Sequence, residues 1–171
     1  MTTELLVLSD THLIPGQLDH LPDQVWDAAS RADTILHAGD VMCDELLDAL
    51  AARARLHAVL GNNDVTQMND LGAGRLEALP DQLVLTIEGV ELAMLHDSGP
   101  RSGRENRMQR RFPSADLVVF GHSHEPISIH TEHKQTLFNP GSPTQRRRQP
   151  RASYGWITLD LGRIEAQIIE L

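Results

Sequence analysis

Histidine and aspartate residues recur in this sequence directly after short apolar runs. Gly121-His122-Ser123-His124 follows the run 116–120, and two earlier runs end in Asp10-Thr11-His12 and Gly39-Asp40. Apolar runs of this length are typical of buried strands, and open α/β sheets bind ligands at the carboxyl ends of their strands. Imidazole and carboxylate groups gathered at that edge could bind divalent metal ions.

Two further runs end in residues that can bind metals. Gly61-Asn62-Asn63-Asp64 follows the run 56–60, and His96 follows the run 90–95. Nitrogen and oxygen donors without thiolates suit a transition-metal dication rather than calcium or magnesium, and they exclude a structural zinc finger. Seven side chains are too many for one ion, so we expect two ions that share a bridging carboxylate. The seven candidate ligands are Asp10, His12, Asp40, Asn62, His96, His122 and His124.

His122 and His124 lie two residues apart. In extended backbone, residues i and i+2 point to the same side of the chain. We therefore expect both imidazoles to reach into one crevice at the end of the strand.

The first half of the chain alternates between strands and helices. Pro22 and Asp44 are the expected helix starts, Pro22 in the first turn and Asp44 as a cap. This alternation predicts an α/β fold with parallel strands. Strands are predicted over 5–8, 34–38 and 56–60, and helices over 22–29 and 45–53.

The second half is richer in strands, and the segment 65–79 has no regular pattern. A hairpin is predicted over 82–87 and 90–95, a helix over 103–112, and further strands over 116–120, 127–133, 136–139, 154–160 and 163–169. Two sheets that both need cover predict a two-sheet β-sandwich flanked by helices on both sides. We expect one domain over residues 1–171, since the composition shows no break.

Composition limits the class of protein. The 171 residues carry a net charge of −9, which disfavours non-specific binding to nucleic acid or membranes. The one cysteine, Cys43, cannot form an internal disulfide and is expected to be a buried packing residue. With no signal peptide and no apolar run long enough to span a bilayer, we expect a cytoplasmic protein.

The ordered set of motifs resembles the calcineurin-like metallophosphoesterases, in the small group of bacterial phosphodiesterases and retromer-subunit-like proteins. This resemblance implies that one metal ion binds Asp10, His12, Asp40 and His124. It implies that the other binds Asp40, Asn62, His96 and His122, with Asp40 as the bridge. It also implies an αββα fold and hydrolysis of a phosphate ester by in-line attack of a hydroxide held between the ions. Manganese is the expected metal, and the ligand set does not separate it from iron, zinc or nickel.

Two neighbouring residues are assigned roles beside the ligands. Asp64 is expected to orient a ligand or a metal-bound water. Asn63 stands where many family members have a histidine that can protonate the leaving group, and an amide cannot do so. We expect Asn63 to hydrogen-bond a phosphate oxygen, and we expect a phosphodiesterase rather than a monoesterase. The family usually has glycine at the position of Asp97, which adds negative charge near the site.

Two groups of arginines remain. Arg101, Arg104, Arg107 and Arg111 share one helical face, where they could either face solvent or hold an anionic group of the substrate. The run 146–148 is expected in an exposed loop and could be a subunit contact in a homo-oligomer.

The remaining histidines are assigned no chemical role. His37 and His57 are expected to be structural because each sits inside an apolar strand, while His20, His130 and His133 are expected to face solvent.

The expected substrate is a phosphate ester, a small molecule or a nucleotide, and a nucleic acid is the less favoured choice. The alternative function is a protein-interaction scaffold on the same fold, which the complete ligand set disfavours. A Rossmann or P-loop nucleotide-binding protein is excluded, because the sequence lacks both glycine-rich motifs.

Overall fold

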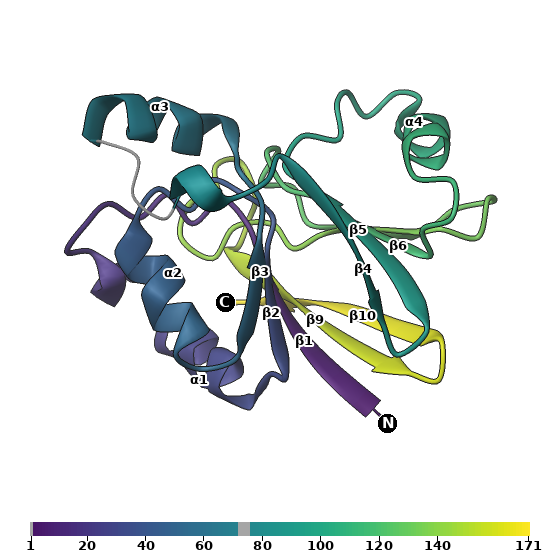
Figure 1. The fold of residues 1–171 in the computed structure, drawn as a ribbon, viewed down its shortest axis with the longest axis horizontal. Coiled ribbons are helices and arrows are strands. Elements are labelled where there is room, and N and C mark those ends of the chain that lie inside the picture. Colours follow the sequence, from purple (N-terminus) through teal and green to yellow (C-terminus); the bar gives the residue numbers. More distant parts are fainter. Residues whose placement is uncertain (1, 72–75) are drawn as a thin grey trace.

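Two β-sheets of five strands each form the centre of the structure, and helices cover their outer faces (Figure 1). The computed structural model describes residues 2–71 and 76–171. In spatial order the first sheet contains β10 (Arg163–Glu170), β9 (Ser153–Asp160), β1 (Thr2–Leu8), β2 (Thr34–His37) and β3 (Arg55–Ala58). The second contains β4 (Gln82–Ile87), β5 (Val90–Leu95), β6 (Leu117–Val119), β8 (Thr136–Asn139) and β7 (Ile127–His130).

Helices lie on both sides of the two sheets. In Figure 1, α1 and α2 lie beside the first sheet and α4 lies beyond the second. This arrangement confirms the predicted α/β sandwich with helices on both faces. The helical elements are η1 (Leu18–His20), α1 (Asp23–Arg31), α2 (Asp44–Ala51), α3 (Asn62–Leu71), η2 (Leu76–Ala78) and α4 (Arg104–Arg111).

Strand β1 explains why an unbroken apolar run folds as a strand here. Leu6 and Leu8 pack into the core under α1 and α2, while Leu5 and Val7 pack into the core between the two sheets. All four side chains are fully buried, and each contributes about 2 kcal/mol of transfer free energy. Because both faces of the strand are covered, an alternating polar pattern would be unfavourable here.

The parallel order of β1, β2 and β3 sets the position of the polar loops. β1 pairs with β2 in parallel, and β2 pairs in parallel with β3. The segments that follow these strands therefore meet at one edge of the sheet. In the second sheet β5, β6 and β8 are also parallel neighbours, so the segments after β5 and β6 lie at a common edge as well.

The structure corrects two predicted helix starts. Pro22 is the residue before α1 rather than its first helical residue, and Cys43 takes the capping position of α2. Asp44 is the first residue of α2, and its carboxylate accepts a hydrogen bond from the backbone N–H of Leu76 at 3.2 Å. The side chain was predicted as a local cap but is used for a contact between distant segments instead.

The segment 65–79 contains more helix than the sequence pattern indicated. α3 continues to Leu71 and η2 covers 76–78, whereas residues 72–75, with Gly72 and Gly74, lie outside the described residues. The hairpin prediction is confirmed, and its turn at Glu88-Gly89 has positive φ at both positions, as a type I′ turn requires.

His37 confirms its predicted structural role. The side chain is fully buried, and its Nε2 lies 3.0 Å from the hydroxyl of Thr11. Burial is the main reason that the pKa of His37 falls to about 3. The imidazole is therefore neutral in the folded protein near pH 7.

We expect His37 to make the fold less stable in acid. Between pH 6.5 and about 3 the unfolded chain binds a proton at this residue and the folded chain does not, so the free energy of unfolding falls as the pH is lowered. One such group contributes a slope of up to about 1.4 kcal/mol per pH unit. Urea unfolding of the metal-stripped protein between pH 4 and pH 8 should show a smaller slope in the variant His37→Gln. The difference between the two proteins should stop changing above pH 7, and equal slopes in acid would contradict the assignment.

Candidate metal centre

Most of the candidate ligands have an unusual backbone conformation. Five of the seven have positive φ, between 47° and 68°, namely Asp10, His12, Asp40, His122 and His124. Residues other than glycine lose of order 1–3 kcal/mol in this region, and such residues cluster at functional sites. The strain points to a site held together by the surrounding fold.

Three of the candidate ligands form a compact group at the ends of β1 and β6. The Nε2 atoms of His12 and His124 lie 3.3 Å apart, and the two rings stack with centroids 5.1 Å apart. Oδ1 of Asp10 lies 3.2 Å from Nε2 of His124 and 3.9 Å from Nε2 of His12. These atoms are close enough to one another to bind a single metal ion.

A second group adjoins the first through Asp40. Oδ2 of Asp40 lies 3.3 Å from Nε2 of His96 and 3.5 Å from Nε2 of His12, so this one oxygen faces both groups. Asp10, Asp40 and His96 also have ligand atoms within reach of a common ion. The two aspartates therefore lie where the groups meet.

Asn62 and His122 lie beside the second group. Oδ1 of Asn62 is 3.0 Å from Nδ1 of His122, and the rings of His122 and His96 are 5.2 Å apart, edge to face. His124 instead stacks on His12. The expectation of extended backbone at His122 and His124 is therefore wrong, because both have positive φ, but their rings do lie in adjacent groups of the same site.

The donor atoms fit metal ions in their chemistry. Oδ1 of Asp10 and Nε2 of His96 are buried and make no hydrogen bond to any residue that the structure describes. Burial acts to raise the pKa of Asp40, but the nearby His96 and Asn63 outweigh it and hold the pKa well below its usual range. For Asp10 burial is likewise outweighed, by His124 and His96, and its pKa is lowered. Ionised carboxylates and imidazole nitrogens are a suitable ligand set for divalent transition metals.

Backbone carbonyls orient two of the histidines. Nδ1 of His96 lies 2.7 Å from the carbonyl of Ala38, and Nδ1 of His124 contacts the carbonyl of Gln145. In each case an Nδ1–H that donates to the carbonyl oxygen directs Nε2 toward the centre, where a neutral imidazole could bind a metal ion through it. This is the tautomer that a metal ligand needs.

Asp64 holds the ends of β2 and β3 together. Its carboxylate is fully buried and accepts hydrogen bonds from the backbone N–H groups of Asp40, Met42 and Gly61 at 2.7–2.8 Å. Burial raises the pKa of Asp64, and the three N–H groups act in the opposite direction. Asp64 thus contacts the backbone of a candidate ligand and no ligand side chain.

Asn63 contacts Asp40 with both its backbone and its side chain. Its backbone N–H donates to Oδ1 of Asp40 at 2.9 Å, and its Nδ2 donates to Oδ2 at 2.7 Å. The predicted contact between Asn63 and a phosphate oxygen stays a prediction.

Two hydroxyl groups that were not predicted as part of the site hydrogen-bond to the backbone next to Asp10 and His12. Ser142 donates to the carbonyl of Asp10 at 2.7 Å, and Thr144 donates to the carbonyl of Thr11 at 2.6 Å. The sequence shows hydroxyl residues beside the Pro140-Gly141 turn, but it could not predict their partners, which lie more than 130 positions away.

A cavity of about 280 Å³ opens beside the second group. Arg111 and Asp97 line it together with His96 and His122, and Oε1 of Gln82 accepts two hydrogen bonds from the guanidinium of Arg111, at 2.6 and 2.9 Å. The cavity could hold part of a substrate next to the candidate ligands.

The other arginines of α4 and the loop before it do not line this cavity. Arg104 is buried over the ring of Phe120, and Arg107 donates to backbone carbonyls of the loop 98–102. Arg101 is exposed and lies 3.8 Å from Glu125. Of the four arginines that could hold an anionic group of the substrate, only Arg111 therefore lines the cavity beside the candidate ligands.

Comparisons with known proteins agree with this geometry. Residues 3–162 match the calcineurin-like phosphoesterase superfamily domain. A probable metallophosphoesterase of Methanothermobacter thermautotrophicus is 32% identical over 95% of this chain and 90% of its own length. A probable metallophosphoesterase of Methanocaldococcus jannaschii is 35% identical over 82% of this chain and 68% of its own length. The chain belongs to the calcineurin-like phosphoesterase superfamily.

Solved structures share the fold. A Thermotoga maritima protein superimposes with a TM-score of 0.71 at 26% identity, covering 99% of both chains. Vps29 of Chaetomium thermophilum superimposes with a TM-score of 0.75 at 16% identity, covering 99% of this chain and 95% of its own.

None of the described helices has both the length and the apolar character needed to cross a membrane.

We expect the variant Asp64→Asn to loosen the centre. An amide can accept at only one atom, so at least one of the three backbone N–H groups loses its partner. The free energy of unfolding should fall by about 2 kcal/mol, and manganese affinity by about tenfold. Urea unfolding of the metal-stripped protein and calorimetric titration with manganese measure the two effects. The exposed Asp19→Asn serves as the control, and equal stability and affinity in both variants would contradict this role.

Proposed function

We propose that this protein hydrolyses phosphate esters, with a preference for phosphodiesters, and that it uses two divalent metal ions. The observation that carries the proposal is the pair of adjoining donor groups with Asp40 facing both. When bound, the two ions would lower the pKa of water, orient the phosphate and stabilise the charge on its oxygens. Manganese is the first choice of metal. We also propose that residues 1–171 act as one domain.

The proposed ligand sets follow the two groups. Asp40 would serve both ions, because its Oδ2 lies between His12 and His96. Asn62 and His122 would complete the second set through donor atoms that now lie 3.0 Å apart. The first ion would be bound by Asp10, His12, Asp40 and His124, and the second by Asp40, Asn62, His96 and His122.

The surrounding residues position and charge these ligands. Asn63 donates two hydrogen bonds to Asp40, which keeps that carboxylate ionised and fixes its orientation. Asp64 holds the backbone of Asp40 against Gly61. A nucleophile from the protein is unnecessary, since water can attack phosphorus directly.

The preference for diesters rests on the family resemblance and on the lack of a general acid for the leaving group. The Asn63 amide cannot donate a proton to a departing alkoxide, and its Nδ2 is already used by Asp40. Esters with good leaving groups are therefore favoured. An archaeal protein described as a phosphodiesterase has the same fold, at 21% identity and a TM-score of 0.71.

The rival proposal is a scaffold that binds other proteins, because several structural neighbours are Vps29 proteins. One of them, from Entamoeba histolytica, is described as complexed with zinc. Metal binding alone therefore does not separate the two functions, and turnover must be measured.

The first experiment measures hydrolysis of bis(p-nitrophenyl) phosphate by metal-stripped protein. Activity should appear on addition of manganese, zinc, nickel or ferrous iron, and two metal ions should be counted per chain. The variant Asp40→Asn should lose about 100-fold or more in kcat, since it removes the shared carboxylate. Asp19→Asn is the matched control. A protein that binds metal but shows no turnover with any of these ions would favour the scaffold.

We expect Arg111 to affect substrate binding more than chemistry. Its guanidinium lines the cavity beside His96 and His122 and would attract an anionic ester. The variant Arg111→Met should raise KM about threefold at low salt, with little change in kcat. Arg110→Met, which changes an exposed residue of the same helix, should leave KM unchanged. Equal KM values for the two variants would remove Arg111 from the substrate site.

A further inference from the structure

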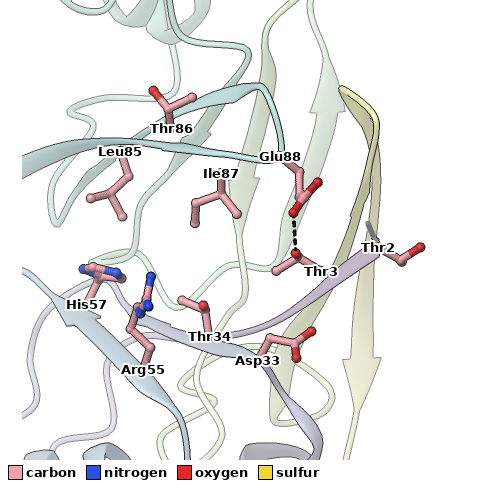
Figure 2. A pocket seen from close by; sticks show the side chains of 10 residues that line it. All are labelled: Thr2, Thr3, Asp33, Thr34, Arg55, His57, Leu85, Thr86, Ile87 and Glu88. Atoms are coloured by element: carbon pink, nitrogen blue, oxygen red, sulfur yellow. Dashed lines mark hydrogen bonds between the residues drawn. The ribbon is translucent and has the colours of Figure 1, made fainter.

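A second cavity, of about 660 Å³, lies between the two sheets (Figure 2). β1, β2 and β3 begin at this cavity, whereas four of the candidate ligands follow the other ends of the same strands, namely Asp10, His12, Asp40 and Asn62. It has more than twice the volume of the cavity beside the metal centre. Its lining residues are Thr2, Thr3, Asp33, Thr34, Arg55, His57, Leu85, Thr86, Ile87 and Glu88.

The sheet order explains why the sandwich is open here. β3 is the edge strand of the first sheet, and β4 is the edge strand of the second. At the opposite edges β10 and β7 contact each other, which closes the sandwich on that side. The cavity occupies the mouth between β3 and β4.

β3 places two polar side chains on the inner face of its sheet. Leu56 and Ala58 pack toward the helices, so Arg55 and His57 face the second sheet. At the corresponding inner positions β1 and β2 carry Leu5, Val7 and Leu36. The apolar pattern of the core therefore stops at β3.

Neither polar group has a partner in the part of the chain that the structure describes. Arg55 and His57 make no side-chain hydrogen bond and no salt bridge there; Arg55 is exposed to solvent and His57 is half-buried. Thr34 pairs in register with Arg55 and is buried, so its hydroxyl lies on the same wall (Figure 2). Burial, with a contribution from Arg55, lowers the pKa of His57. Near pH 7 this wall therefore offers one guanidinium cation, a neutral imidazole and a hydroxyl.

The opposite wall is apolar. Leu85 and Ile87 of β4 are half-buried and point toward Arg55 and His57, while Thr86 points away (Figure 2). A ligand in this cavity would therefore meet a cation on one side and two aliphatic side chains on the other.

Acidic residues limit the charge that the cavity can accept. Oδ2 of Asp33 accepts from the backbone N–H of Glu4 at 2.8 Å, and Oε1 of Glu88 accepts from the hydroxyl of Thr3 at 3.3 Å. Both carboxylates line the cavity beyond Thr34, as seen from Arg55. A second anionic group on the ligand would be repelled there.

We propose that this cavity binds a small organic monocarboxylate. The guanidinium of Arg55 would pair with the carboxylate in bidentate geometry, with His57 and Thr34 as additional hydrogen-bond donors. Leu85 and Ile87 would pack on the apolar part of the ligand. The site is independent of the metal centre and of the proposed phosphoesterase activity.

The test is a titration of the metal-stripped full chain with hexanoate, followed by ¹⁵N-resolved NMR and calorimetry. Shifts should cluster at residues 34, 55, 57, 85 and 87 and should be absent at residues 96 and 121. Hexanol, which lacks the charge, and adipate and hexyl phosphate, which carry a second negative charge, should bind about tenfold or more weakly.

Variants separate this site from general anion binding. Arg55→Met should weaken hexanoate binding about tenfold or more, whereas Arg163→Met, at an exposed arginine of β10, should not. Arg55→Lys keeps the charge but loses the bidentate geometry, so its affinity for hexanoate should lie between those of Arg55→Met and the unmodified protein. The spectrum of each variant without ligand reports whether it is folded. No saturable binding up to about 10 mM hexanoate, equal binding by Arg55→Met, or shifts confined to the metal centre would each overturn the proposal.

Discussion

The buried carboxylate of Asp64 is the interaction on which the candidate metal centre depends. It accepts backbone N–H groups from the segments after β2 and β3 and so ties Asp40 to Gly61. A side chain at position 61 would collide with the carboxylate of Asp40, so this close approach requires glycine. The shared candidate ligand is therefore held by backbone contacts before any metal ion contributes.

Glycines also allow close packing at other strand ends of the candidate centre. Gly121 has no room for a side chain beside Ser9 and Asp10, and Gly39 has none beside His96. The candidate ligands Asp40 and His122, which directly follow Gly39 and Gly121, have left-handed backbone. The strain is supported by hydrogen bonds from elements far apart in the sequence, such as that from Ser142 to the carbonyl of Asp10. A rigid shell of this kind can hold several charged groups close together.

The two ends of the sandwich have different chemistry because the strands are parallel. The carboxyl ends of β1, β2, β5 and β6 lead into imidazoles and carboxylates. The amino ends of β1, β2 and β3, together with the carboxyl end of β4, enclose a cavity with one arginine and two aliphatic residues. The core between the sheets, with Leu5, Val7 and Leu36, separates the two ends. A ligand at one end therefore need not compete with a ligand at the other, and the proposed functions can be tested separately.

The sequence by itself determined the fold class and the grouping of the candidate ligands. Apolar runs such as 5–8 predicted buried strands, and the residues after them predicted which side chains meet, because strand ends at one sheet edge are neighbours. Whether those side chains bind metal ions stays a prediction. The assignment of His37 as structural also followed from its place inside an apolar strand.

Only the tertiary structure decided how individual side chains are used. Asp44 was predicted to cap its own helix but contacts Leu76, and His57 was predicted to be a structural residue of an apolar strand but lines a cavity. Arg107 was grouped with possible anion ligands but holds a loop through its carbonyls. The physical reason is the same in each case. Local spacing fixes the face on which a residue lies, but the partner on that face comes from a distant segment, and only the packed chain brings the two together.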